Sequence, residues 1–260
     1  MTPVIQKNNT GMCGNVIVMF TDFGLEGPYI GQLQAVLHQQ ASGIPVINLF
    51  SDLTPFDIQG AACLLPAYAA GFPPASVFLC VVDPGVGGAR PGVVVQADDR
   101  WYVGPNEGLF AMLVRQSGKV ECWQLPEPAD VSASFHGRDV FAPVAARLAR
   151  GGDVPGESVP VGCLERTDWP DDLFRVVYID RFGNAITGVR ASTVAEDVVL
   201  HVAGQPVKRA RTFSDVPMGD AFWYANANGL VEFAVNRGRA DKVHGLQAGT
   251  SFELGSGLES

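Results

Sequence analysis

The stretch SVFLCVVDPGVGGAR, residues 76–90, joins a run of apolar residues to a glycine-rich loop that has a charged residue at each end. An apolar run of this length, bounded by a turn signal, is typical of a buried strand in an α/β sheet. Fully extended, the seven residues from Asp83 to Arg90 would span about 23 Å, but glycine accepts backbone angles that let a loop curl back. An Asp83–Arg90 pair at the carboxyl end of the strand is therefore feasible, where open α/β sheets bind ligands. The alternative is a glycine turn with a solvated surface charge pair.

This loop lacks the features of the common nucleotide-binding loops. No Lys followed by Ser or Thr comes after its glycines, and no G-x-G-x-x-G sequence opens a helix there. Arg90 is followed by Pro91 and another β-rich stretch, so no helix N-terminus is available to hold a pyrophosphate.

Residues 16–150 alternate short β-rich runs with longer helical patterns, which predicts a Rossmann-like α/β sheet covered by helices. The predicted strands are residues 16–21, 45–50, 76–82, 93–97, 101–103 and 120–125. The predicted helices are residues 28–40, 57–71, 107–116 and 139–150. Pro66 and Pro143 fall inside two of these helices, which we expect to kink or split there.

Residues 151–173 are rich in Gly, Pro and acidic residues and have no sustained periodicity, so they are interpreted as a linker. From residue 174 onward, short β runs are separated by Gly, Asn and Pro turns, which favours a small all-β barrel or sandwich. We therefore predict an N-terminal α/β domain over residues 1–165 and a C-terminal all-β domain over residues 174–260, with residues 166–173 ending the linker.

The composition excludes several classes of protein. The 260 residues are 47% hydrophobic and 17% charged, as in a globular chain. With 18 basic and 27 acidic residues, the formal charge of −9 argues against nucleic acid as a partner. The five cysteines form no C-x-x-C pair, so neither a disulfide framework nor a metal site is predicted, and the cytoplasm fits best. We see no export signal and no apolar run of the roughly 20 residues that would span a membrane.

Other polar residues stand at positions where a ligand could bind. Asp22, in TDFG, follows the first predicted strand and could accept two hydrogen bonds from a ribose diol, although capping a turn is at least as good an interpretation. His136, in SFHGRD, precedes a predicted helix whose dipole favours a neutral ring, or it is simply a capping or core histidine. Asn184, near Asp180 in IDRFGN, could bind a purine edge or form a hairpin turn.

Several aromatic residues are candidate stacking surfaces for a planar ligand, although each is more often part of a core. They are Phe56, Phe135, Phe182, Phe213 and Tyr224.

Taken in order, the motifs TDFG, TPFDIQGAA, VVDPGVGGAR, GPNEGL, SFHGRDVFAPVAA and DRFGN resemble those of the S-adenosyl-L-methionine (SAM) hydroxide adenosyltransferase family. These enzymes are adenosine-forming SAM hydrolases related to fluorinases and chlorinases. The resemblance implies an N-terminal α/β domain, a C-terminal β-barrel and a homotrimer that binds SAM between neighbouring subunits. It also implies that SAM is hydrolysed to adenosine and L-methionine by water attack at the ribose C5′ carbon, without a cofactor or metal.

The resemblance assigns roles to particular residues. Asp83, Arg90 and His136 fall at the positions that manage the attacking water. Asp22 would hold the ribose diol, Asn184 the adenine edge, Asp180 the methionine ammonium group and Phe213 a face of the nucleoside.

Halogenases of this group have Tyr in place of the Asp, and fluorinases carry an additional loop for which residues 93–104 leave no room, so the resemblance favours hydrolysis. A SAM-dependent halogenase and a noncatalytic SAM or adenosine sensor stay open as alternatives. The chain departs from the pattern of this family in two places. Many members have Asp shortly after TDFG, where this chain has Gly27, and Ala227 and Asn228 correspond to polar groups that help hold methionine in the halogenases.

Overall fold

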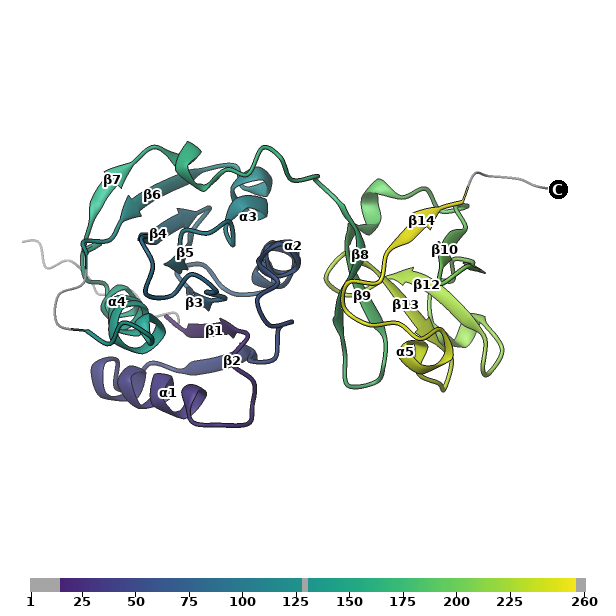
Figure 1. The fold of residues 1–260 in the computed structure, drawn as a ribbon, viewed down its shortest axis with the longest axis horizontal. Coiled ribbons are helices and arrows are strands. Elements are labelled where there is room, and N and C mark those ends of the chain that lie inside the picture. The colour runs from purple at the N-terminus through teal and green to yellow at the C-terminus, as the bar shows by residue number, and fades with distance from the viewer. Residues whose placement is uncertain (1–14, 128–130, 256–260) are drawn as a thin grey trace, which may run out of the picture.

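The computed structural model describes residues 15–127 and 131–255. Residues 1–14, with Cys13, and residues 256–260, which the predicted domains include, lie outside the described residues. Within the described part, a large mixed sheet precedes a region of antiparallel sheets (Figure 1). The predicted sequence of an α/β region and then a β region is confirmed at this level.

The first region contains a seven-stranded sheet in the order β2-β1-β3-β5-β4-β6-β7. β1 is parallel to β2 and β3, and β3 is parallel to β5, whereas β4, β6 and β7 continue the sheet in antiparallel pairs. The strands are β1 (Ile17–Thr21), β2 (Val46–Phe50), β3 (Val77–Val81), β4 (Gly92–Ala97), β5 (Arg100–Pro105), β6 (Val120–Gln124) and β7 (Glu157–Val159).

Helices cover both faces of this sheet, because alternate side chains of the central strands point to opposite sides. From β3, Val77 and Leu79 join the core beneath α1 (Tyr29–Gln40) and α4 (Ala142–Ala149). Phe78 and Cys80 join the core beneath α2 (Ile58–Ala69) and α3 (Ala111–Gln116). Every residue of β3 is buried, as the continuous apolar run predicts.

The C-terminal region has two antiparallel sheets around a core that includes Trp223. The four-stranded sheet has the order β12-β13-β9-β8 and the three-stranded sheet the order β11-β10-β14. Their elements are β8 (Leu173–Ile179), β9 (Ala185–Arg190), β10 (Leu200–Val202), β11 (Gln205–Val207), β12 (Ala221–Ala225), β13 (Leu230–Val235), α5 (Ala240–Val243) and β14 (Phe252–Leu254). Figure 1 shows β8 and β9 facing α2, and Val177 of β8 belongs to the same core as that helix.

Three local predictions need correction. The linker interpretation is wrong for β7, which pairs with β6. The third helix begins at Ala111 rather than at residue 107. Pro66 does not split its helix, because α2 continues across Pro66 as one helix whose surrounding side chains are buried. The expected split near Pro143 is confirmed, since a π-helical turn, η1 (Gly137–Phe141), precedes α4.

Candidate active site

The Asp83 and Arg90 side chains form a buried, two-point ion pair. Arg90 Nε donates to Asp83 Oδ1 over 2.8 Å, and Arg90 Nη2 donates to Asp83 Oδ2. The two side chains are 5% and 8% exposed, which rules out the solvated surface pair that the sequence left open. The pair lies directly after β3, where the loop was expected to curl back.

Loop closure depends on two glycines. Gly87 has a φ of +80°, a left-handed conformation that most side chains disfavour. Gly85 donates its backbone N–H to Glu107 Oε2 over 3.2 Å, and a Cβ at Gly85 would lie 1.9 Å from Glu107 Oε1. Glu107, from the motif GPNEGL, therefore holds the loop that carries Asp83.

His136 completes the set. Arg90 Nη2 lies 3.0 Å from His136 Nδ1, and the guanidinium carbon lies 5.3 Å from the centre of the Phe141 ring. Since a guanidinium can only donate, Nδ1 accepts, and this partner chemistry assigns the proton of the neutral ring to Nε2. The arginine thus fixes the positions of both a carboxylate and an imidazole.

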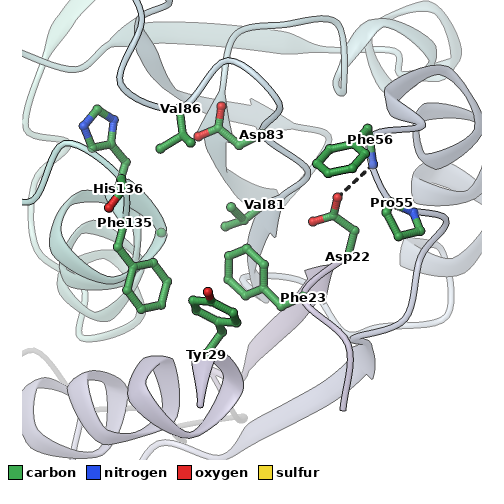
Figure 2. A pocket seen from close by; sticks show the side chains of 12 residues that line it. Asp22, Phe23, Tyr29, Pro55, Phe56, Val81, Asp83, Val86, Phe135 and His136 are labelled. Carbon is green, nitrogen blue, oxygen red and sulfur yellow. Dashed lines mark hydrogen bonds between the residues drawn. The ribbon is translucent and has the colours of Figure 1, made fainter. Parts of the chain in front are cut away.

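A cavity of about 350 Å³ lies beside this set, in the size range of small-molecule sites. Its lining brings together the predicted residues Asp22, Phe56, Asp83, Phe135 and His136. Figure 2 shows the Asp22 and Asp83 carboxylates on the same pocket, with the rings of Phe23, Tyr29 and Phe135 along one side. These three rings contact one another at centroid distances of 5.4–5.9 Å.

Asp22 follows β1 and accepts a hydrogen bond from the backbone N–H of Phe56 over 3.1 Å. Burial raises the pKa of Asp22, the backbone N–H groups of Phe56 and Asp22 lower it, and the nearby Asp83 carboxylate raises it. Two carboxylates and an imidazole in one aromatic pocket are suited to binding a polar, hydroxyl-bearing ligand and to handling a proton beside it.

Two segments that together make up most of the chain match a known family. Residues 17–157 match the model of the SAM hydroxide adenosyltransferase N-terminal domain, and residues 174–253 match that of the C-terminal domain. The chain belongs to the SAM hydroxide adenosyltransferase family. The resemblance drawn from the motifs is confirmed.

Known relatives of this family member align with nearly the full length of the chain. The (R)-S-adenosyl-L-methionine hydrolase of Thermus thermophilus is 41% identical over 92% of this chain and 98% of its own. A fluorinase from an Actinoplanes species is 21% identical over 93% of this chain and 98% of its own. A crystal structure of an uncharacterized conserved protein from Thermotoga maritima superposes with a TM-score of 0.82 at 28% identity, covering 93% of this chain and all of that one.

The remaining predicted site residues of this family member lie in the C-terminal region. The Asp180 carboxylate accepts from the backbone N of Asn184 over 2.9 Å and from its side-chain Nδ2 over 3.0 Å. Phe182, at the tip of this turn, is exposed. Phe213 and Tyr224 contact each other at a centroid distance of 5.6 Å, and Asn228 N donates to Asn226 Oδ1. In the described part of the chain, the lining of the Asp22–Asp83 pocket includes none of these six predicted residues.

Sequence reasoning missed several residues that line the Asp22–Asp83 pocket. Phe23 and Pro55 line the pocket from within the motifs TDFG and TPFD, and Ser134 precedes Phe135, so adjacency could have indicated them. Tyr29, Val81, Val86 and Gly137 also line it.

Glu232 is a further missed residue, beside the C-terminal candidates. It is buried, accepts from Tyr224 OH over 2.6 Å and from Asn226 Nδ2 over 2.9 Å, and burial raises its pKa. The sequence feature that could have indicated Glu232 is a carboxylate inside the apolar run LVEFAV.

The described residues contain no group of three or more His, Cys, Asp or Glu side chains that could hold a metal ion. Among the helices of the described ranges, none is both long and apolar enough to cross a membrane.

Proposed function

We propose that this enzyme hydrolyses SAM to adenosine and L-methionine, with water attacking the ribose C5′ carbon. The observation that carries the proposal is the buried Asp83–Arg90–His136 set at the edge of an aromatic pocket that also holds Asp22. Family membership and the (R)-S-adenosyl-L-methionine hydrolase relative support the same chemistry.

The reaction suits a pocket with apolar walls. A C–O bond forms at C5′ as the C–S bond breaks, the sulfur keeps the bonding electron pair, and methionine leaves as a neutral thioether. The water proton is released, so SAM and water give adenosine, methionine and a proton. A sulfonium cation meets a nucleophile that becomes anionic, and a site that excludes water favours this loss of charge.

The three polar residues then have separate tasks. Asp83 accepts the proton of the attacking water, and Arg90 stabilises the developing negative charge while its other bonds hold Asp83 in place. His136, held through Nδ1, orients the water. Asp22 binds the ribose diol through charge-assisted hydrogen bonds, in the pocket that Phe56 and Phe135 also line.

We propose that the remaining binding groups come from a neighbouring subunit of a homotrimer. Asp180 would bind the methionine ammonium group and Asn184 the adenine edge, with Phe182, Phe213, Tyr224 and Asn228 around them. The support is that these residues cluster in the C-terminal region and not on the Asp22–Asp83 pocket of their own chain. A ligand bound between two subunits would contact the pocket residues of one subunit and the C-terminal residues of the other.

We also propose that the two C-terminal sheets form one barrel and that the predicted two-domain division holds. Isolated bridges between Arg175 and Ser251 and between Arg209 and Trp223 support closure, because they join the edges of the two sheets. Free thiols at Cys63, Cys80, Cys122 and Cys163 support a cytoplasmic, reducing location. The chemistry proposed above draws only on side chains and water, so we propose that it needs no cofactor.

The test is to incubate the purified protein with SAM in water carrying a heavy oxygen isotope and to identify the products by mass. We expect adenosine and methionine, with the label in the adenosine. The reaction should continue in the presence of a chelator. Label in methionine, a product other than adenosine, or a strict requirement for added divalent cation would overturn the proposal.

A further inference from the structure

The wall of the pocket that carries Phe56 is a short segment between β2 and α2 with an unusual backbone. Phe56 has a φ of +64° and a side chain that is 73% exposed. A left-handed conformation is unfavourable for an aromatic residue and persists only where surrounding bonds impose it. Its N–H donates to Asp22 Oδ2, and its carbonyl accepts from Ile58 N over 3.1 Å.

Strand β8 of the C-terminal region holds this segment on both sides of Phe56. On one side, Arg175 binds Asp57 at two points, from Nη1 to Oδ2 and from Nη2 to Oδ1, each over 2.7 Å. On the other side, Thr54 Oγ1 donates to the carbonyl of Val177 over 3.0 Å. These are contacts between parts of the chain more than 100 residues apart.

The Arg175–Asp57 ion pair lies where it can influence the shape of the pocket. The side chains of Arg175 and Asp57 are 22% and 14% exposed, so water screens them only in part. Asp57 Oδ1 also accepts from Gly60 N over 2.9 Å, which makes it the N-cap of α2. Asp57 therefore fixes the start of α2 relative to β8, and Phe56 is the residue directly before it.

We infer that Arg175 is a positioning residue for the site: through Asp57 it holds Phe56 in the conformation that forms the pocket wall. The C-terminal region of each chain thus shapes the substrate pocket of its own N-terminal region. This inference rests on the proposed function, in which the pocket binds the nucleoside part of SAM.

The first test compares Arg175→Met with a matched control, Arg190→Met. Arg190 makes a comparable two-point pair with Asp172, over 2.9 and 2.8 Å, and the two side chains are 37% and 13% exposed. Among the described residues, the hydrogen bonds of this pair involve none of residues 52–57. Since Phe56 would contact substrate similarly in the ground and transition states, Arg175→Met should raise KM about five- to tenfold and leave kcat within about twofold. Arg190→Met should change KM by less than about twofold.

The second test asks whether the effect passes through Phe56. In a Phe56→Gly background the wall side chain is absent, and Arg175→Met should then change KM by less than about twofold. Full additivity of the two substitutions would overturn the inference, as would equal KM effects of Arg175→Met and Arg190→Met. Asp57→Asn should also raise KM, because Asn still caps a helix but cannot form the ion pair. If Arg175→Met does not fold, Arg175→Lys, which keeps the charge and loses the two-point geometry, should shift KM in the same direction.

A third measurement needs no substrate. Hydrogen exchange of the amides in residues 53–58 should be at least about tenfold faster in Arg175→Met than in wild type, and unchanged in Arg190→Met. Unchanged exchange in Arg175→Met would overturn the inference. If wild-type protein does not convert SAM while exchange responds as expected, the proposed function fails and the structural link between Arg175 and Phe56 stands.

Discussion

The backbone N–H of Phe56 donates to the Asp22 carboxylate over 3.1 Å, which ties the end of β1 to the segment before α2. Burial raises the pKa of Asp22 despite this bond. The ionised carboxylate is therefore less favourable in the folded protein than in the unfolded chain. A carboxylate kept in such a place is consistent with selection for binding at the expense of stability.

Asp22→Asn should weaken SAM binding and stabilise the protein. A raised folded pKa means that the stability contributed by the protonated group is present at low pH and lost as the pH rises through that pKa. Asn mimics the protonated form and can still accept from Phe56, so Tm at pH 7 should rise by about 1–3 °C. Affinity should fall about tenfold or more, because two charge-assisted bonds to the diol are lost.

Calorimetric titration with SAM and thermal melts from pH 4 to pH 8 check both effects. The difference in Tm between the variant and wild type should grow toward neutral pH. A wild type that is more stable than the variant at pH 7 would contradict the assigned cost of burying Asp22.

Arg90→Lys should lower kcat about 100-fold or more with little change in SAM affinity. Lysine keeps the charge but cannot hold both Asp83 oxygens and His136 Nδ1 in one plane. Single-turnover rates and calorimetric affinities separate the two effects. Arg115→Lys is the control, since Arg115 also makes several bonds, to Asp171 and to backbone carbonyls, away from the pocket. Near wild-type turnover in Arg90→Lys would refute its catalytic role.

Gly85→Ala should reduce kcat because the new Cβ and Glu107 cannot both occupy their places. Glu107 must move, and the loop that carries Asp83 loses the Gly85–Glu107 hydrogen bond. We expect a loss of about tenfold or more in kcat, given the sensitivity of catalysis to small displacements. Gly71→Ala, where a Cβ has no neighbour within 4 Å, should leave turnover unchanged. Equal rates for the two variants would show that the loop tolerates displacement.

Fluoride or chloride should give no 5′-halogenated adenosine. The Asp83 carboxylate lies beside the position proposed for the attacking water, and a halide has no proton to donate to it, so the two repel. Product masses after incubation of SAM with high concentrations of each halide provide the measurement. A halogenated nucleoside formed at a rate comparable to hydrolysis would refute the proposed role of Asp83.

Much of the arrangement around Asp83 could be predicted from sequence because its signals are local. The apolar run before Asp83 fixes the strand, the glycines permit the return of the loop, and Arg90 is only seven positions away. Asp22 and His136 were likewise placed by the elements beside them. These three residues match the expectations because the position of each depends on its own segment.

Contacts between distant segments left no such signal. The Arg175–Asp57 pair joins positions 118 apart, and nothing in the spacing indicates it. β7 has only three residues and is a strand because it pairs with β6, so sequence periodicity cannot reveal it. Tyr29 joins the pocket through contacts with Phe23 and Phe135 that exist only after folding.

The two groups of predicted binding residues define the last prediction. Asp83 and Asp22 line a pocket on the N-terminal region, whereas Asn184 is held by Asp180 in the C-terminal region. If the complete site forms between subunits, then an Asp83→Asn subunit retains an intact C-terminal half-site. An Asn184→Ala subunit retains an intact N-terminal half-site.

Mixing these two inactive variants after unfolding and refolding should restore activity. In randomly assembled trimers, about a quarter of the interfaces would pair an intact N-terminal half-site with an intact C-terminal one, so activity should approach that share of wild type. Mixing Asp83→Asn with His136→Ala is the matched control: both lesions lie in the same half-site, and no interface is restored. Steady-state rates across mixing ratios, with trimer formation checked by sedimentation, make the measurement. Activity that stays at the level of the separate variants in refolded mixed trimers would mean that each site is built within one chain.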